Sequence, residues 1–174
     1  MTNTTQESYI TQEVTQEAAC AGKKIYFSNS ISGVPDLDRE FGYNLVNFMI
    51  NHGAHVLSEH VAARTPEGST RIRKKNNISL EGVENIAREI RKQDIDFVDN
   101  ATHFIAIVNS PSHGVGMEIE RALLKPARGL PATPILCLVH ESRFEKLSGM
   151  ISGVGLEESS CFYLKIYKTL EYAQ

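Results

Sequence analysis

The sequence predicts an α/β fold in which a mainly parallel, five-stranded sheet carries helices on both faces. Short apolar runs rich in β-branched and aromatic residues alternate along the chain with longer segments whose apolar residues recur every three or four positions. Such alternation favours parallel strands joined by crossover helices. The 174 residues, of which 41% are hydrophobic, suffice for one compact core but not comfortably for two. We therefore expect a single Rossmann-like domain.

The first strand is expected at 24–28 (KIYFS), followed by a polar loop and a helix at about 36–52. In that helix Phe41 and Leu45 belong to a row of apolar residues that share one face. Gly53 stands where a C-terminal cap would fall, so the helix should end just before it.

The second strand is expected at 55–58 (HVLS), and the polar, basic segment 59–78 is interpreted as a mobile loop because it lacks periodicity. Helical spacing resumes near Ser79 and continues to Val98. The two most apolar strands, 102–108 and 135–139, should be central in the sheet. The remaining elements expected are strands at 102–108, 135–139 and 162–166, helices beginning near Val115 and covering about 143–150, and a helical C-terminal end.

Residues 1–22 are rich in Thr, Gln, Glu and Ala, and predict a disordered tail ahead of one domain over 23–174. They lack the charged and apolar regions of a signal peptide. No run approaches about 18 consecutive apolar residues, so no membrane span is expected. Three scattered cysteines argue against a disulfide framework and favour a reducing, cytoplasmic compartment.

The formal net charge of -3 provides no overall positive field, so a nucleic-acid polymer is not expected as a partner, whereas one phosphate needs only local donors. Ligands of parallel sheets bind beyond the carboxyl ends of the strands, so the loops after Ser28, Ser58 and Val108 should converge on one site. The loop 109–114 (NSPSHG) leads into a helix start, where free N–H groups favour an anion. On its own, this pattern is more often a tight turn without a ligand.

Glu118 is expected in the first turn of that helix, where the helix dipole would keep its pKa low. An ionised carboxylate is what a nucleophile requires, although a glutamate can also favour a helix start for stability alone. Asp94 and Asp96 point about 100° apart on a helix, so at most one should face the pocket. No HExxH or CxxC spacing occurs, and no metal is expected.

Five parts of the chain, in this order, resemble the 2'-deoxynucleoside 5'-phosphate N-hydrolases, within the wider nucleoside 2-deoxyribosyltransferase family. The resemblance covers about Lys24 to Tyr172 and implies that 23–174 is the catalytic domain. The matching stretches are 25–31 (IYFSNSI), 56–62 (VLSEHVA), 93–94 (QD), 112–118 (SHGVGME), and 135–138 (ILCL) with 147–151 (LSGMI).

The resemblance implies roles at the matching positions and no cofactor. Glu118 corresponds to the nucleophile, Asp94 to the aspartate that engages the sugar and assists departure of the base, and Tyr26 to the tyrosine near that pair. The remaining correspondences are Ser112 and Gly114 as phosphate contacts, Ser148 as a phosphate contact from the other subunit of a homodimer, and His60, Ser30 and Ile31 on the base side.

The chain departs from the family in its first loop. Where the nucleotide hydrolases carry an arginine and paired glycines, this sequence has Ser32, Gly33 and Val34. Losing an arginine weakens the case for a 5'-phosphate, because arginine is the usual charge-assisted partner of that group. The serines and the helix start could suffice, or a cation of the basic stretch could substitute for the arginine. The candidates there are Arg71, Arg73 and Lys74.

The expected activity is hydrolysis of the N-glycosidic bond of a (2'-deoxy)nucleoside 5'-monophosphate, giving free base and a sugar 5-phosphate through a glycosyl-enzyme on Glu118. Three alternatives stay open: deoxyribosyl transfer to a second base, a ribonucleotide N-glycosidase of the cytidylate type, and a nucleotide-sensing module without turnover. The presence of Tyr26 together with the Asp94 and Glu118 pair argues against the sensing module. Ser112 and Ser148 favour a nucleotide hydrolase over a transferase.

Overall fold

The computed structural model describes residues 19–31, 36–76, 78, 80–82 and 84–169. Five parallel strands form one sheet in the order β2-β1-β3-β4-β5. The strands are β1 (Lys24–Ser28), β2 (His55–Val56), β3 (His103–Ile107), β4 (Ile135–His140) and β5 (Phe162–Tyr167). The helices are α1 (Asp36–Asn51), α2 (Pro66–Lys75), α3 (Ile86–Asn100), α4 (His113–Leu123) and α5 (Gly149–Ser152), with 3-10 turns η2 (Glu59–Ala62), η3 (Pro126–Arg128) and η4 (Glu141–Lys146).

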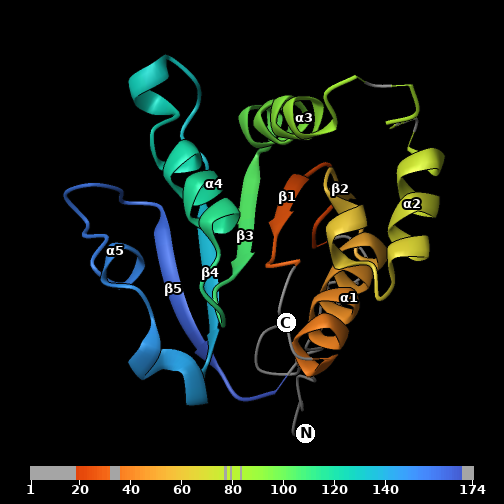
Figure 1. Cartoon of the computed structure of the whole chain (residues 1–174). Coiled ribbons are helices and arrows are strands. Elements are labelled where there is room, and N and C mark those ends of the chain that lie inside the picture. The colour runs from red at the N-terminus through yellow and green to blue at the C-terminus, as the bar shows by residue number, and fades with distance from the viewer. Residues whose placement is uncertain (1–18, 32–35, 77, 79, 83, 170–174) are drawn as a thin grey trace, which may run out of the picture.

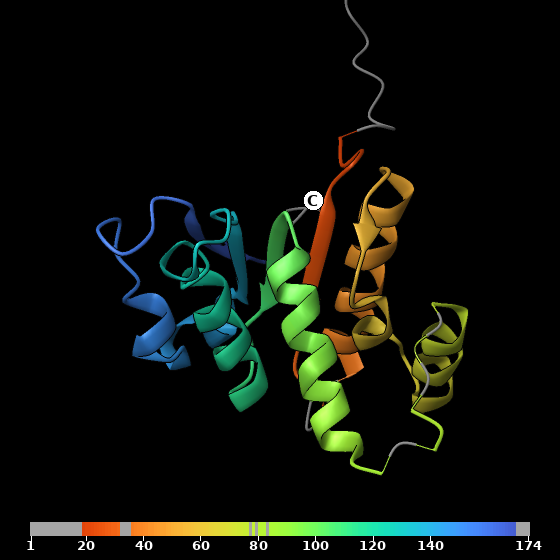
Figure 2. The same cartoon turned by 90° about the horizontal axis from the view of Figure 1, so that it is seen from above.

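The predicted α/β fold is confirmed, and the apolar strands β3 and β4 lie inside the sheet as expected. Figure 1 shows α4 in front of β3 and β4, and Figure 2, the view from above, shows α3 and α4 side by side. Arg121 of α4 joins these two helices by donating from Nε and Nη2 to Asp99 of α3, at 3.0 and 2.5 Å.

Two apolar clusters fill the two faces of the sheet, because successive side chains of a strand point to opposite faces. Ile25 and Phe27 of β1 pack with α1 in one cluster. Tyr26, between them in sequence, packs in the other cluster with Val98 of α3 and Val115 of α4. The pleat of β1 therefore directs the Tyr26 hydroxyl toward the face that carries α3 and α4.

The prediction of a loop over 59–78 is wrong, because this segment contains η2 and the ten-residue helix α2. Thr65 caps α2, its hydroxyl accepting from the Gly68 backbone N–H at 3.0 Å, and Pro66 occupies the first helical position. No residue of α2 is buried, so the helix has no apolar stripe for a periodicity test to find. The Thr-Pro pair was the available signal.

Further boundaries differ from the sequence prediction, and the strand expected at 55–58 covers only His55–Val56. The helix expected from Ser79 begins after Asn85, whose side chain accepts from the Arg88 backbone N–H at 3.0 Å. The helix expected at 143–150 is two short pieces, η4 and α5, with Ser148 at the N-cap of α5. In both cases a capping side chain sets the start of the helix.

The ends of the chain are described only in part. Within the expected tail, residues 19–22 form a turn whose Cys20 backbone N–H donates to the His52 carbonyl at 2.9 Å. Residues 1–18 of that tail, and most of the expected C-terminal helical end, lie outside the described residues. Within the part of the chain that is described, no helix is long and apolar enough to cross a membrane.

We expect Ser58→Ala to lower the free energy of unfolding by about 1–3 kcal/mol, as measured by urea denaturation. The buried Ser58 hydroxyl donates to the Phe27 carbonyl at 2.7 Å and accepts from the Phe27 backbone N–H at 2.8 Å. Alanine leaves these two backbone groups of the inner strand β1 without that partner. The exposed Ser160→Ala provides the control and should unfold like the wild type; equal stability of both variants would refute the assigned role.

Candidate active site

The Glu118 carboxylate lies at the carboxyl end of β1 and accepts two hydroxyl hydrogen bonds. Ser28 Oγ donates to Glu118 Oε2 at 2.5 Å, and the Tyr26 hydroxyl also bonds the carboxylate. Ser28 and Tyr26 are each 1% exposed, and both come from β1, whereas Glu118 comes from α4. The sheet and the helix together therefore fix the orientation of the carboxylate.

The environment of Glu118 raises its pKa to about 7, mainly because burial penalises the charged form. The Ser28 bond lowers the pKa, the nearby charge of Asp94 raises it, and the Tyr26 bond lowers it. The expectation of a low pKa is thus wrong. Because α4 begins at His113, Glu118 lies in its second turn, beyond the first turn over which the dipole acts, and desolvation dominates.

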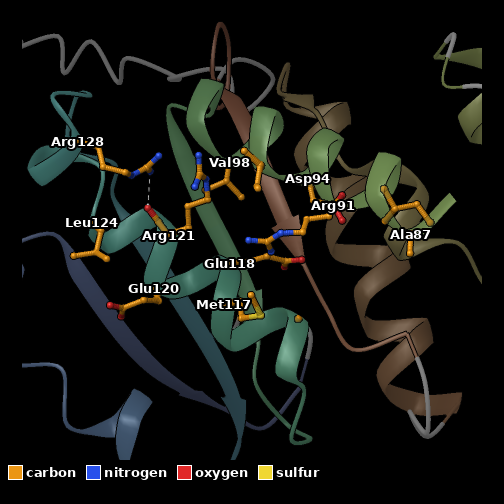
Figure 3. A pocket seen from close by; sticks show the side chains of 13 residues that line it. Ala87, Arg91, Asp94, Val98, Met117, Glu118, Glu120, Arg121, Leu124 and Arg128 are labelled. Carbon is orange, nitrogen blue, oxygen red and sulfur yellow. Dashed lines mark hydrogen bonds between the residues drawn. The ribbon is translucent and has the colours of Figure 1, made fainter. Parts of the chain in front are cut away.

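The second carboxylate, Asp94 of α3, faces the same space as Glu118. Both line a cavity of about 610 Å³ between α3 and α4, and Figure 3 shows Asp94, Arg91 and Glu118 around it. Burial raises the Asp94 pKa, while the charge of Arg73 acts in the opposite direction. Asp96 is exposed and does not line this cavity, in keeping with the expectation that at most one of the pair faces it.

The start of α4 adjoins the Glu118 carboxylate. Ser112 is the N-cap, and its Oγ accepts from the Val115 backbone N–H at 3.4 Å. A Cβ placed on Gly114 would lie 3.9 Å from Glu118 Oε1 and 3.9 Å from Ser112 Oγ. Gly114 thus lies between the N-cap and the carboxylate, and backbone N–H groups at this helix start can approach an anion.

A second cavity, of about 270 Å³, is lined by Ser30, Ile31, His60 and Arg73. His60 is 3% exposed, and its buried Nδ1 has no hydrogen-bond partner among the residues that the structure describes. Burial, followed by the charge of Arg73, lowers the His60 pKa to about 4, so the imidazole is neutral near pH 7. Three residues predicted for the base side are thus brought together.

Ser148 is not brought to either cavity. Its side chain is exposed at the start of α5, where Oγ accepts from the Met150 backbone N–H at 3.3 Å. The other predicted residues come from β1, the loop after it, η2, α3 and the start of α4. A contribution of Ser148 to the same site would require a second copy of the chain.

Sequence reasoning missed Ser28 and the position of Arg73. The signal for Ser28 was a small polar residue that ends a buried strand, although its bond to Glu118 spans 90 positions of sequence. Arg73 was read only as one cation of a basic stretch. Among the described residues, no three His, Cys, Asp or Glu side chains are grouped so that they could hold a metal ion. That the site needs no cofactor stays a prediction.

Known proteins are similar to this chain over most of its length. A protein of Tetraodon nigroviridis named 5-hydroxymethyl-dUMP N-hydrolase is 34% identical over 130 residues, which cover 75% of this chain and 79% of the relative. A protein of Nematostella vectensis named as a 2'-deoxynucleoside 5'-phosphate N-hydrolase 1 is 30% identical over 152 residues, which cover 84% and 86%. No family model matches the chain.

The chain belongs to the 2'-deoxynucleoside 5'-phosphate N-hydrolase family. The predicted family and enzyme class, a nucleotide N-glycosidase, are therefore confirmed. A solved CMP N-glycosidase of Clostridium botulinum, BcmB, superposes with a TM-score of 0.55 over 87% of this chain and 93% of the other, at 19% identity. That likeness shows that the N-hydrolase chain and the CMP N-glycosidase share a fold.

Glu118→Gln should make this N-hydrolase more stable than the wild type above neutral pH. The Glu118 pKa is 4.5 without the folded environment and about 7 with it, so the folded state binds more protons in that window and loses stability as pH rises through it. The ionised carboxylate then costs about 3 kcal/mol at high pH. Glutamine does not titrate, so it avoids this loss.

Denaturant unfolding at about pH 5 and about pH 8 tests this expectation. The gap between variant and wild type should widen toward high pH. The exposed Glu120→Gln on the same helix should show no such change. A pH-independent gap for Glu118→Gln would contradict the raised pKa.

Proposed function

We propose that this enzyme hydrolyses the N-glycosidic bond of a 2'-deoxynucleoside 5'-monophosphate, with Glu118 as nucleophile. The observation that carries the proposal is the half-buried Glu118 carboxylate, bonded by Ser28 and Tyr26 and facing Asp94 across a cavity. Membership of the N-hydrolase family supports the class of reaction. The products are the free base and 2-deoxyribose 5-phosphate.

In the first step, Glu118 attacks C1' of the sugar through an oxocarbenium-like transition state, as in retaining glycosidases. A bond forms between the carboxylate oxygen and C1', the C1'–N bond breaks, and its electron pair goes to the base. With a pKa of about 7, a substantial fraction of Glu118 is ionised near neutral pH. Burial leaves this anion poorly hydrated, while the two hydroxyls hold it in the attacking orientation.

In the second step, water attacks C1' and the electron pair of the sugar–oxygen bond returns to Glu118. Asp94 carries the protons of the cycle. Its raised pKa allows a protonated carboxyl to donate to the departing base, and the resulting carboxylate then accepts a proton from the attacking water. Two neighbouring carboxyl groups with unlike surroundings suit this division into nucleophile and acid.

The 5'-phosphate is assigned to the start of α4, beside Ser112 and Gly114. Free backbone N–H groups and the helix dipole favour an anion there. Ser148 of a second copy would complete this subsite, so we propose that the enzyme works as a homodimer. Support comes from the position of Ser148, which lies exposed on α5 and lines neither cavity.

The base is assigned to the cavity lined by Ile31, Ser30 and His60. Relatives from Tetraodon nigroviridis and Homo sapiens are named for a pyrimidine nucleotide, 5-hydroxymethyl-dUMP. We therefore favour a pyrimidine base.

The cysteines Cys20, Cys137 and Cys161 are free thiols, which supports a reducing, cytoplasmic setting.

Glu118→Gln should reduce kcat for base release by more than tenfold, a loss above about 1.4 kcal/mol, with a smaller effect on KM. Glutamine keeps the shape of the side chain but cannot form the glycosyl-enzyme, so the lost interaction belongs to the transition state. Chromatography of released base from a panel of deoxynucleotides measures the rate. Retention of more than about a tenth of wild-type turnover would exclude Glu118 as nucleophile.

The dimer is tested by sedimentation at assay concentration together with Ser148→Ala. We expect a homodimer, and about a tenfold higher KM for nucleotides with little change for nucleosides, because only nucleotides carry the phosphate. Ser152→Ala, on the same short helix, is the control. A fully active monomer would remove Ser148 from the site.

A further inference from the structure

We propose that Arg73 of α2 is a specificity-determining residue that, with His60, binds the carbonyl edge of a pyrimidine-2,4-dione and stabilises the negative charge on that base as it departs. The inference rests on the proposed function and names the chemical class of its leaving group. It assigns to Arg73 a role different from phosphate binding.

The buried imidazole of His60 is the first feature of this cavity that suits a base with carbonyl groups. His60 is almost fully buried in its wall, and within the described parts of the chain its Nδ1 has no hydrogen-bond partner. A buried polar atom without a partner is costly, and a ligand atom can remove that cost. The neutral imidazole offers either a donor or an acceptor at Nδ1, according to its tautomer, so it suits a base edge that carries both C=O and N–H groups.

Arg73 adds a cation to the same cavity. Its Nη1 donates to Gln93 Oε1 at 3.3 Å, which directs the guanidinium toward α3. In the described part of the chain, Arg73 forms no ion pair with a carboxylate. A guanidinium has five N–H donors, so donors remain for the O2 and O4 carbonyls of a bound base.

The position of Arg73 relative to the carboxylates suits the chemistry of the leaving group. Arg73 lines the cavity assigned to the base, Asp94 lines the cavity that holds Glu118, and the opposite charges of Arg73 and Asp94 interact. When Glu118 bonds to C1' and the C1'–N bond breaks, the electron pair enters the base and spreads from N1 to the carbonyl oxygens. A fixed cation beside those oxygens stabilises the charge where it develops.

The proton balance of the reaction is unchanged by this role. The departing pyrimidine-dione anion first pairs with Arg73 and then accepts the proton of Asp94 at nitrogen, which releases neutral base. Arg73 stays protonated throughout, because its role requires charge and not proton transfer. A base whose anion is already stable should need this help least.

The experiment compares Arg73→Met with the wild type on 2'-deoxyuridine 5'-monophosphates whose 5-substituent is fluorine, hydrogen or methyl. Fluorine makes the base a more acidic leaving group, and methyl makes it a less acidic one. We expect kcat to fall about 100-fold for the 5-methyl substrate and far less for the 5-fluoro substrate. The rate should thus depend more steeply on leaving-group acidity in the variant than in the wild type.

Two further variants separate charge from structure. Arg73→Lys keeps the cation and should restore part of the rate on the 5-methyl substrate. Arg88→Met removes an exposed arginine of α3 that lines neither cavity and should leave all three rates unchanged. Thermal unfolding of each variant reports whether the fold is intact.

Equal loss of rate on all three bases would overturn the proposal and leave Arg73 with a structural role. A loss confined to nucleotides, with matching nucleosides unaffected, would overturn it in favour of phosphate binding. Failure of the wild type to release base from any nucleotide would refute the proposed function, and with it this inference. If the wild type is active and the rate of Arg73→Met depends on leaving-group acidity as steeply as that of the wild type, the inference is refuted while the proposed function stands.

Discussion

The removal of one carboxylate from water is the constraint on which the rest of this site depends. Glu118 is held by Ser28 and Tyr26, both fully buried residues of β1. Burial disfavours the anion, and the two hydroxyls recover only part of the lost hydration, so the folded protein keeps a group that is unfavourable for stability. In the proposed mechanism, the same desolvation favours attack by the anion, because little water must leave before it approaches C1'. Stability and reactivity are therefore opposed in a single side chain, and the paired strands β1 and β3 provide the rigid support that this requires.

Charged side chains from two helices, Asp94 of α3 and Arg73 of α2, influence the ionisation of the candidate site. The nearby charge of Asp94 raises the electrostatic cost of ionising Glu118, since like charges at short range resist ionising together. The charge of Arg73 lowers the pKa of Asp94, whereas Arg73 is not among the groups that shift the pKa of Glu118. The two carboxyl groups thus differ in surroundings although they face one cavity. This difference is the physical basis for giving them different parts in one reaction.

The strands of the sheet can be predicted from the sequence more accurately than the properties of the site. Strands such as β1 and β4 are continuous apolar runs, so their positions follow from composition within a residue or so. Helix α2 escapes detection because it buries nothing, and its start depends on the Thr65 cap. The location of Glu118 near the start of α4 could be predicted, but its pKa could not. That value is set mainly by burial in the folded chain, and the smaller influences on it come from side chains of β1 and α3. The orphaned Nδ1 of His60 is likewise a property of packing that no pattern of residues displays.

Helix α2 presents Arg73 to the base cavity while contributing no buried residue to either apolar cluster. Substitutions along α2 should therefore have little effect on folding, since surface changes away from packed groups are usually within about 0.5 kcal/mol of neutral. Tyr26 and Ser28, which bond the Glu118 carboxylate, are buried in the core, so substitutions there should destabilise the fold. If α2 recognises the base as proposed, base preference could change through substitutions on this surface helix without any need to restabilise the sheet.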